Sequence, residues 1–302
     1  MAEYTLRQLE YFVAVAEAGS VTAAAAAVHL SQSAMSTALA DLERALDVQL
    51  LLRHHARGVT LTAAGEQLVV ASRQLLNQAG ELLSEAQGLG KALTGSLMLG
   101  CFSVLAPYVL PEIHATCAER YPELRLVTRE EDLDELAAGV LSGRFELGLG
   151  YNLEPDSRLA MTSVFALPPY LLVPAGHRLA GRRKVRLEQL GGEPLALLDL
   201  PQSREYFLGL FAAAGIEPNV RYRTTSVETA RALVGLGLAC TLLNLRPKMS
   251  TSLDGHEVVP VALAEDSSAL DVVMLTAATG RPTRRAAAVA DLCVEVLRRR
   301  AP

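Results

Sequence analysis

Residues 20–43 carry the pattern that most constrains how this chain can fold. An alanine-rich run from about Val21 to Val28 predicts a short helix whose small side chains let it pack closely against a neighbour. A second helix is expected after Ser31, because apolar side chains recur there at helical spacing, at Ala34, Met35, Ala38, Leu39 and Leu42. Two short helices joined by a turn are typical of DNA-binding proteins in which the second helix enters the major groove. The second helix here has the required two faces, one apolar face for the core and one polar face for the DNA.

The polar side of the second helix begins with Gln32, Ser33, Ser36 and Thr37. We expect Gln32 to pair with adenine through two hydrogen bonds, and the three hydroxyls to contact base edges or phosphates. A plain helical hairpin has similar hydrophobic spacing, so the spacing alone leaves that alternative open. The segments that follow favour the DNA-reading interpretation.

A short wing is predicted directly after these helices. Leu50–Leu52 and residues 59–62 have the composition of two strands, and residues 53–58 between them form a basic turn. Arg53 and Arg57 are the strong cations near this surface, so we expect them to contact phosphates or the minor groove. The alternative for Arg53 is a salt bridge within the domain.

The net charge of −5 argues against DNA binding through phosphate neutralisation alone. Within residues 1–65, six acidic side chains outnumber four arginines. Binding to DNA would therefore require positive charge that is local to the wing, and more than one copy of the reading helix.

A heptad of leucines follows the wing. A long helix is predicted from Thr62, its N-cap, to about Leu89, and it carries leucines seven residues apart at Leu68, Leu75, Leu82 and Leu89. This spacing favours a coiled-coil seam between two copies of the chain. The alternative is a single amphipathic helix that packs on its own domain.

From Ser96 the pattern changes to alternating strands and helices, which predicts a mostly parallel sheet with helices on both faces. The cycle restarts near Leu195, so we expect two similar α/β lobes with a ligand cleft between them. The predicted parts are a winged helix-turn-helix domain (residues 1–62), a linker helix (63–90) and an effector domain (91–302). Within the effector domain, lobe I takes about 91–163 and 267–302, and lobe II about 164–266.

Three strand-to-helix junctions are expected to face this cleft. They carry Ser103, then Ser203 with Arg204, and then Thr225 with Ser226. Backbone N–H groups and the dipole at a helix N-terminus favour anions, and Arg204 would add a two-pronged contact to a carboxylate. A small carboxylate-bearing metabolite is therefore the preferred effector class. The alternatives are that the hydroxyls only cap helices and that Arg204 is a surface residue.

The sequence disfavours several other classes of protein. It contains no nucleophile elbow, phosphate-binding loop or complete dinucleotide fingerprint, so no catalytic residue is assigned and an enzyme is not expected. Its four scattered cysteines suggest neither a zinc site nor a disulfide framework, and Cys240 is expected to be a core residue. No metal, cofactor, membrane span or signal segment is predicted, and a reducing cytoplasm fits best.

The chain resembles the LysR-type transcriptional regulators over essentially its full length. The residues that carry the resemblance are Leu6–Val15, Gly19–Ser20, Ala24–Ala27, Leu30–Gln32, Asp41–Glu43 and Leu61–Gly65, and downstream Val109–Pro111, Tyr121–Pro122, His177–Ala180 and Gly235–Gly237. The resemblance implies a winged helix-turn-helix, a linker-helix dimer and a two-lobed domain like type 2 periplasmic binding proteins. As partners it implies double-stranded promoter DNA, a small-molecule effector, further copies of the chain in a homodimer or homotetramer, and RNA polymerase.

The chain also departs from the family pattern in its reading helix. Many family members have Pro where this chain has Ser33, and often Arg where it has Thr37, so the operator preference of relatives does not transfer. A rival interpretation from another class is a solute-binding protein whose N-terminal helices mediate assembly only.

Overall fold

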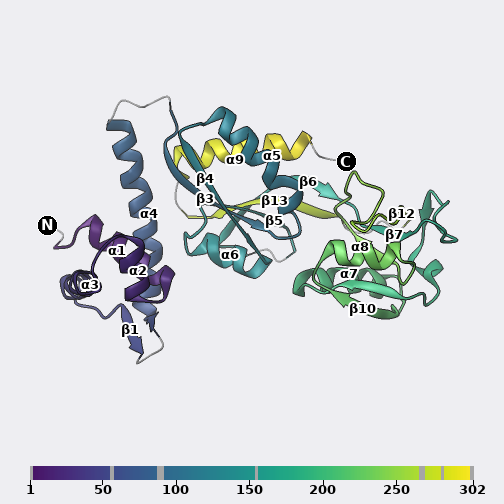
Figure 1. Cartoon of the computed structure of the whole chain (residues 1–302), viewed down its shortest axis with the longest axis horizontal. Coiled ribbons are helices and arrows are strands. Elements are labelled where there is room, and N and C mark those ends of the chain that lie inside the picture. The colour runs from purple at the N-terminus through teal and green to yellow at the C-terminus, as the bar shows by residue number, and fades with distance from the viewer. Residues whose placement is uncertain are drawn as a thin grey trace.

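The computed structural model describes residues 3–54, 58–86, 92–153, 156–264, 269–279 and 282–299. Figure 1 shows an N-terminal unit at one end of the molecule, a long helix beside it, and two α/β lobes in line beyond that helix. The predicted class, helix-turn-helix followed by a long helix and two α/β lobes, is confirmed. No helix within the described residues is long and apolar enough to cross a membrane.

Three helices and a two-stranded hairpin make up the N-terminal unit. They are α1 (Leu6–Ala18), α2 (Val21–Ala27), α3 (Gln32–Leu46), β1 (Leu51–His54) and β2 (Gly58–Leu61). Local signals set the helix starts, because Thr5 and Gln8 form a capping box and Ser20 and Ser31 cap the next two helices. Buried apolar side chains from all three helices form one core with the start of the long helix.

The long helix α4 (Ala63–Ala86) connects this unit with lobe I. Arg73 and Asn77 lie one turn apart and face the lobe. Arg73 donates to the carbonyl oxygen of Ser142 at 2.9 Å, and Asn77 Oδ1 accepts a hydrogen bond from Arg285 at 2.8 Å. Arg73 also pairs with Glu17 of α1 at 3.1 Å. One guanidinium therefore joins the N-terminal unit, the long helix and lobe I.

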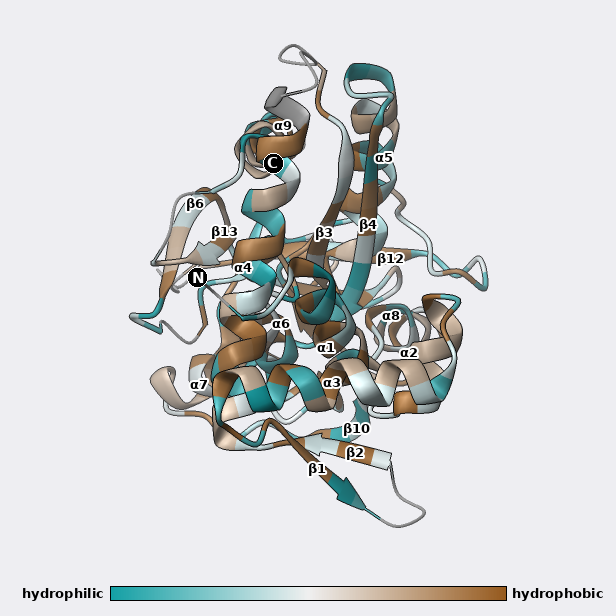
Figure 2. Cartoon of the chain, turned by 90° about the vertical axis from the view of Figure 1, so that its left-hand side faces the viewer, coloured by the Kyte–Doolittle hydropathy of each residue, from teal (hydrophilic) through white to brown (hydrophobic). Residues whose placement is uncertain are grey.

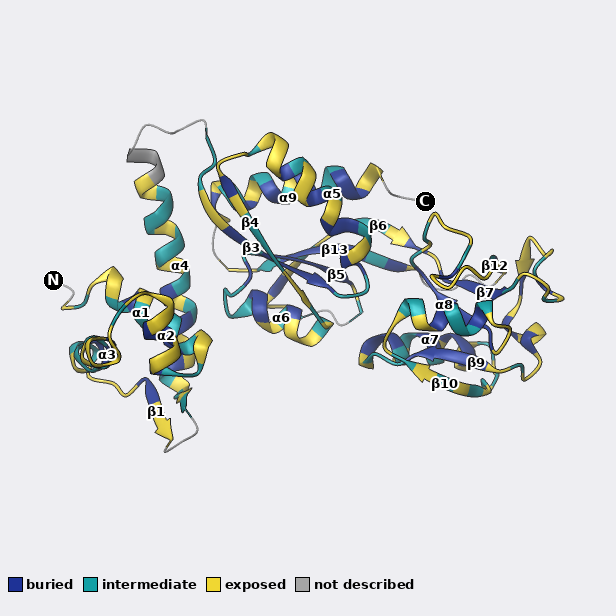
Figure 3. Cartoon of the chain, in the orientation of Figure 1, coloured by how far each residue is buried: buried dark blue, intermediate teal, exposed yellow. Residues whose placement is uncertain are grey.

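Lobe I is built on a five-stranded sheet with the order β4-β3-β5-β13-β6. Its elements are β3 (Gly95–Phe102), α5 (Ala106–Arg120), β4 (Leu124–Glu131), α6 (Leu133–Leu141), β5 (Leu147–Tyr151), β6 (Leu159–Leu167), β13 (Leu270–Ala277) and α9 (Arg284–Arg299). Strands β3, β4 and β5 run parallel, whereas β13 pairs antiparallel with β5 and β6. Figure 3 shows that the buried residues concentrate on this sheet and on the helix sides that cover it.

Lobe II contains a four-stranded sheet with the order β11-β7-β12-β8 and a separate parallel pair, β9 and β10. Its elements are β7 (Tyr170–Pro174), β8 (Lys184–Val185), the 3-10 helix η1 (Leu187–Leu190), β9 (Leu195–Leu198), α7 (Pro201–Ala213), β10 (Val220–Thr224), α8 (Val227–Gly235), β11 (Thr241–Leu243) and β12 (Val258–Leu263). Strand β7 is antiparallel to both of its neighbours. The prediction of a mostly parallel sheet was therefore wrong for the four-stranded sheet of this lobe.

The first helix of lobe I begins later than predicted. Helix α5 starts at Ala106 and not near Ser103, because the chain makes a turn after β3 before it enters the helix. The N–H of Ser103 donates to the carbonyl of Glu131 at 2.9 Å, so it is held by the neighbouring strand β4. Ser103 therefore does not lie at a helix N-terminus.

The first long helix of lobe II begins earlier than predicted. Helix α7 starts at Pro201, a residue whose fixed φ suits a first helical position, and not after the predicted junction at Ser203 and Arg204. Ser203 and Arg204 consequently lie inside its first turn and not ahead of it. Strand β6 also stays in the lobe I sheet as far as Leu167, which places the crossing into lobe II after residue 167 and not at about 164.

Candidate DNA-binding surface and ligand cleft

The first turn of α3 presents polar side chains opposite its buried face. Ser31 caps the helix by accepting the N–H of Ala34 at 3.1 Å, and Gln32 and Ser33 follow it as exposed residues. Thr37 is also exposed, and its hydroxyl donates to the carbonyl of Ser33 at 3.0 Å. Figure 2 shows α3 beside the β1–β2 hairpin, which projects from the same end of the molecule. Gln32, Ser33 and Thr37 are thus accessible to solvent on the unit that carries the hairpin.

Ser36 differs from the other three polar residues of this helix. Its Oγ is buried and has no hydrogen-bond partner among the described residues. At 3.6 residues per turn, Ser36 lies at the border of the face that buries Met35 and Leu39. The sequence analysis predicted that Ser36 would contact DNA because its side chain is polar. In the structure its hydroxyl is buried and is not accessible to DNA.

Of the two arginines of the wing, Arg53 lies within the described residues and is exposed. Arg53 lies exposed on β1, and the part of the chain that the structure describes contains no ion pair or hydrogen bond to its guanidinium. The salt bridge considered as an alternative is therefore absent from that part. His54 Nε2 and the Thr60 hydroxyl lie 2.8 Å apart across the hairpin. Arg57 lies outside the described residues.

A carboxylate that the sequence analysis did not single out fixes the wing to the reading helix. Glu43 Oε1, on α3, accepts the backbone N–H groups of Leu50 at 2.7 Å and Leu51 at 3.1 Å. Both leucines are buried, so these N–H groups have little access to water. The contact spans seven and eight residues of sequence between a helix and a strand, and no local motif announces it. It sets the angle between α3 and the hairpin.

The leucine heptad of α4 is exposed along most of its length. Leu68 packs against the core of the N-terminal unit, whereas Leu75 is 40% exposed and Leu82 is 68% exposed. Leu83 is also exposed. Leu89 lies outside the described residues. Large apolar side chains in a row on a helix surface are typical of an interface.

A small cavity lies between the lobes and is lined by one of the predicted effector residues. It measures about 20 Å³, and Ser203 lines it together with apolar side chains of both lobes, including Val104, Tyr151, Phe207 and Val227. Asn244 lines the same cavity. The cavity is therefore formed by both lobes and sits where a ligand would contact both.

Asn244 has an acceptor atom without a partner. The side chain is only 6% exposed, and its Nδ2 donates to the carbonyl of Leu167 at 2.9 Å and to the Tyr206 hydroxyl at 3.0 Å. Its Oδ1 is buried and has no hydrogen-bond partner among the described residues. A buried unpaired acceptor costs about 1–3 kcal/mol, so a bound molecule with an N–H or O–H group would stabilise this site.

The other predicted effector residues do not gather around this cavity. Arg204 pairs with Asp199 at 2.9 Å. Ser226 caps α8 by accepting the N–H of Thr229 at 3.2 Å, as the capping alternative predicted. Thr225 is exposed, and Ser103 is half-buried without lining the cavity. Of the five residues, Ser203 alone is in its lining.

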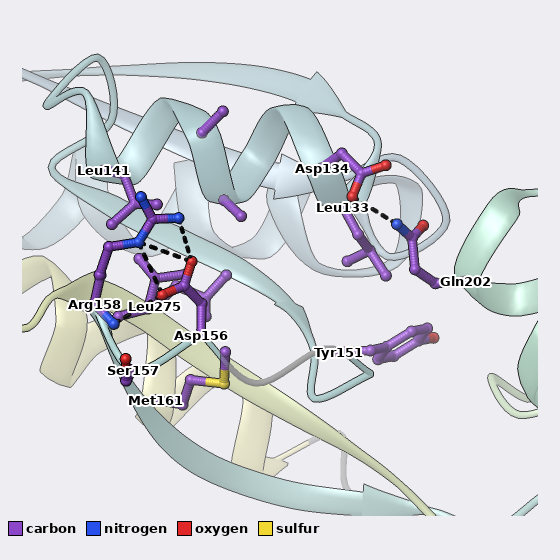
Figure 4. Close-up of a pocket in the computed structure, with 13 residues that line it drawn as sticks. Leu133, Asp134, Leu141, Tyr151, Asp156, Ser157, Arg158, Met161, Gln202 and Leu275 are labelled. Carbon is purple, nitrogen blue, oxygen red and sulfur yellow. Dashed lines mark hydrogen bonds and ion pairs between the residues drawn. The ribbon is translucent and has the colours of Figure 1, made fainter.

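A wider groove of about 570 Å³ adjoins the cleft on the lobe I side (Figure 4). Gln202 of α7 reaches across the lobes there and donates to Asp134 Oδ1 of α6 at 2.7 Å. Arg158 pairs with Asp156 at 2.7 Å, and its hydrogen bonds lower the pKa of that carboxyl to about 2. Asp156 and Arg158 are thus already paired with each other. Among the described residues that line the groove, no buried side-chain polar atom lacks a hydrogen bond, in contrast to Asn244 Oδ1 in the smaller cavity.

All four cysteines are buried, and they belong to both lobes. Burial raises the pKa of the Cys240 and Cys293 thiols to about 12, and it also raises the pKa of Cys101 and Cys117. The thiolate is the reactive form of cysteine, so each site holds its sulfur in the unreactive form.

A helix end that can enter the major groove, combined with a two-lobed domain that encloses a cavity, is typical of DNA-binding regulators that sense small molecules. Comparison with known families supports both halves of this description. Residues 6–66 match the bacterial regulatory helix-turn-helix proteins of the lysR family, and residues 90–298 match the LysR substrate binding domain. The chain belongs to the LysR family of transcriptional regulators.

Individual relatives agree with this assignment. A hydrogen peroxide-inducible genes activator of Dickeya chrysanthemi is 32% identical over 239 residues, which is 79% of this chain and 78% of that protein. A probable hydrogen peroxide-inducible genes activator of Streptomyces viridosporus is 37% identical over 247 residues, covering 79% and 77%. HinK, a LysR family transcriptional regulator from Pseudomonas aeruginosa with a crystal structure, is 35% identical to this chain in sequence. The two structures superpose with a TM-score of 0.66, over 99% of this chain and 100% of the HinK chain. The prediction of a DNA-binding transcriptional regulator of the LysR type is thus confirmed.

Proposed function

We propose that this regulator reads promoter DNA with Gln32, Ser33 and Thr37 of α3 and with Arg53 of the wing. The observation that carries the proposal is the exposed polar turn of α3 beside an arginine with no partner in the described structure. Gln32 would read bases and Arg53 would contact phosphate. Arg57 is proposed as a second phosphate contact on the basis of its position in the sequence of the wing. Ser36 is not proposed as a DNA contact, because its hydroxyl is buried.

Arg53→Ala should weaken promoter binding by about tenfold for all sequences alike, and should lower the slope of log affinity against log salt by about 1. The reason is the loss of one phosphate contact. Titration of labelled promoter DNA at several salt concentrations measures both quantities. Arg221→Ala is the matched control, since Arg221 is an exposed arginine of lobe II. If Arg53→Ala and Arg221→Ala lose the same promoter affinity, Arg53 contributes only through the net charge of the protein and not through a direct phosphate contact.

The proposed unit of action is a homodimer held by the leucines of α4, and two such dimers on one promoter form a homotetramer. In this scheme residues 1–62 bind DNA, 63–90 link and dimerise, and 91–302 bind the effector. A change in lobe closure would alter the spacing of the reading helices and hence the half-sites that are bound together. RNA polymerase would then be the further partner at the promoter.

We propose that one hydrogen-bonding group of the effector enters the cavity lined by Ser203 and Asn244, which at about 20 Å³ admits a group no larger than a water molecule. The supporting observation is the buried Oδ1 of Asn244, to which no donor in the described part of the chain makes a hydrogen bond. The residues that line the cavity carry no charge, so they favour a neutral hydrogen-bonding group at this point of the effector. A carboxylate-bearing metabolite remains compatible if its acid group reaches Arg204 and displaces Asp199.

The names of the relatives raise the question of peroxide, and we propose that this chain does not sense it through a thiolate. The support is that all four cysteines are buried with raised pKa values. Because the pKa of each thiol is raised by burial, the folded protein should contain little thiolate at about pH 8.

We expect a thiol reagent at about pH 8 to label none of the cysteines of the native protein within minutes. All four cysteines should react once the chain is unfolded in denaturant. The measurement is mass spectrometry of the labelled protein at timed intervals. One fast-reacting thiol in the native state would overturn the proposal and would identify a peroxide-sensing candidate.

A further inference from the structure

Three side chains from separate segments of lobe II meet beside the start of β11. His177 follows β7, Glu193 lies between η1 and β9, and Cys240 directly precedes β11. Cys240 Sγ lies 3.5 Å from Glu193 Oε2 and 3.9 Å from His177 Nε2, and the last two atoms are in hydrogen-bond contact. Cys240 is 3% exposed, and the other two side chains are mostly buried. The three potential ligand atoms all lie within 4.8 Å of one another.

We propose that His177, Glu193 and Cys240 bind one divalent cation of the zinc class through Nε2, Oε2 and Sγ. An imidazole, a carboxylate and a thiolate are ligands that Zn²⁺ combines in proteins. A tetrahedral zinc ion with ordinary bond lengths holds its sulfur about 3.6 Å from a nitrogen or oxygen ligand. The two sulfur distances, 3.5 and 3.9 Å, bracket that value, whereas His177 Nε2 and Glu193 Oε2 are in direct hydrogen-bond contact and must move apart when they bind the ion.

The surroundings supply room for a fourth ligand. A cavity of about 20 Å³ is bordered by Glu193 and Cys240, and a water molecule needs about 10–15 Å³ measured in this way. Three protein ligands plus one water complete a tetrahedral zinc shell. Oxygen-preferring cations such as Mg²⁺ are disfavoured, because only one carboxylate oxygen is on offer.

The neighbouring groups both orient the carboxylate and limit its affinity. Arg178 donates from Nε at 3.0 Å and from Nη2 at 2.6 Å to Glu193 Oε1, which leaves Oε2 for the ion. Partners of this kind fix metal-binding carboxylates in place. The positive charge of Arg178 opposes a second cation nearby, so binding should be weaker than at a closed site with four protein ligands.

Proton balance follows from the ligand chemistry. The backbone N–H of Leu179 donates to His177 Nδ1 at 3.2 Å, so the neutral imidazole carries its proton on Nε2, where it faces Glu193. Metal binding moves that proton to Nδ1 at the cost of the Leu179 hydrogen bond. The Cys240 thiol releases its proton to solvent as the sulfur–metal bond forms.

Cobalt binding to the metal-free, reduced full-length protein tests the proposal. One equivalent of Co²⁺ should produce the near-ultraviolet absorption of a thiolate–cobalt bond, Zn²⁺ should remove it, and Mg²⁺ should not. Cys240→Ser should abolish the absorption. His177→Gln and Glu193→Gln should each weaken Co²⁺ binding by about tenfold or more.

His256→Gln is the matched control, because His256 also lies beside an acid, Asp254, at 3.1 Å but belongs neither to the cluster of His177, Glu193 and Cys240 nor to the lining of the adjoining cavity. Its Co²⁺ affinity should equal that of the parent. Circular dichroism confirms that each variant is folded, and Cys240→Ala replaces Cys240→Ser if the latter is not. The proposal is overturned if the parent shows no such absorption, if the absorption survives in the Cys240 variant, or if His256→Gln weakens binding as much as His177→Gln.

Discussion

A chain that carries Leu75→Glu together with Leu82→Glu is expected to be monomeric and to bind a two-half-site promoter about 10²–10⁴-fold more weakly than the parent. Both leucines are exposed on α4, so the substitutions leave the fold of one chain intact while they place like charges across the proposed seam. The N-terminal unit is acidic overall, which makes tight binding depend on two reading helices held together. Light scattering and promoter titration measure the two effects.

The control for this variant places two glutamates at positions that each directly precede a leucine of the row. Gln67→Glu with Gln74→Glu alters two exposed positions that also lie seven residues apart, outside the leucine row. This control should stay dimeric and should keep most of its promoter affinity. If the leucine variant remains dimeric, α4 is an amphipathic helix of a single chain, and the assembly must use another surface.

Glu43→Ala should lower the free energy of unfolding of the N-terminal unit by about 3 kcal/mol, because it removes two hydrogen bonds to a charged acceptor and the lower end of the range for such a bond is about 1.5 kcal/mol. The substitution leaves the buried N–H groups of Leu50 and Leu51 without their acceptor. Promoter affinity should fall with it, since the wing is no longer held at a fixed angle to α3. Denaturant unfolding followed by circular dichroism measures the first effect.

Glu10→Ala, at an exposed position of α1, is the control for charge and should change stability by no more than about 0.5 kcal/mol. Glu43→Gln should fall between the two, because an amide oxygen still accepts but carries no charge. A stable Glu43→Ala protein with normal promoter affinity would show that the wing is positioned by its apolar contacts alone.

The sequence predicted the elements whose signals are local. The alanine-rich run of α2, the start of α3 after Ser31 and the apolar spacing of α3 each lie within a few residues of what they determine. Helix starts near a turn were less predictable. The turn after β3 delays α5 past Ser103, and Pro201 advances α7, so that Ser203 moved from a junction into a helix.

Features that depend on distant contacts could not be predicted from the sequence. The pairing of Arg204 with Asp199 follows from the side-chain directions at the start of α7, which no spacing reveals. Asn244 is ordinary in sequence, and its unpartnered oxygen appears only when the two lobes are assembled around it. Cys240 looked like an isolated core thiol because the histidine beside it lies 63 residues away.

Helix α4 can also be considered as a lever arm. Its 24 residues, at 1.5 Å each, span about 36 Å, and Arg73 attaches it both to lobe I and to α1. Arg73 lies ten residues, or about 15 Å, from the start of the helix, so a tilt of about 10° about this point would displace that start by about 2.6 Å, close to one base-pair step of about 3.4 Å. A rotation of lobe I that is too small to alter its own hydrogen bonds could thus move the reading helix from one base-pair register to another.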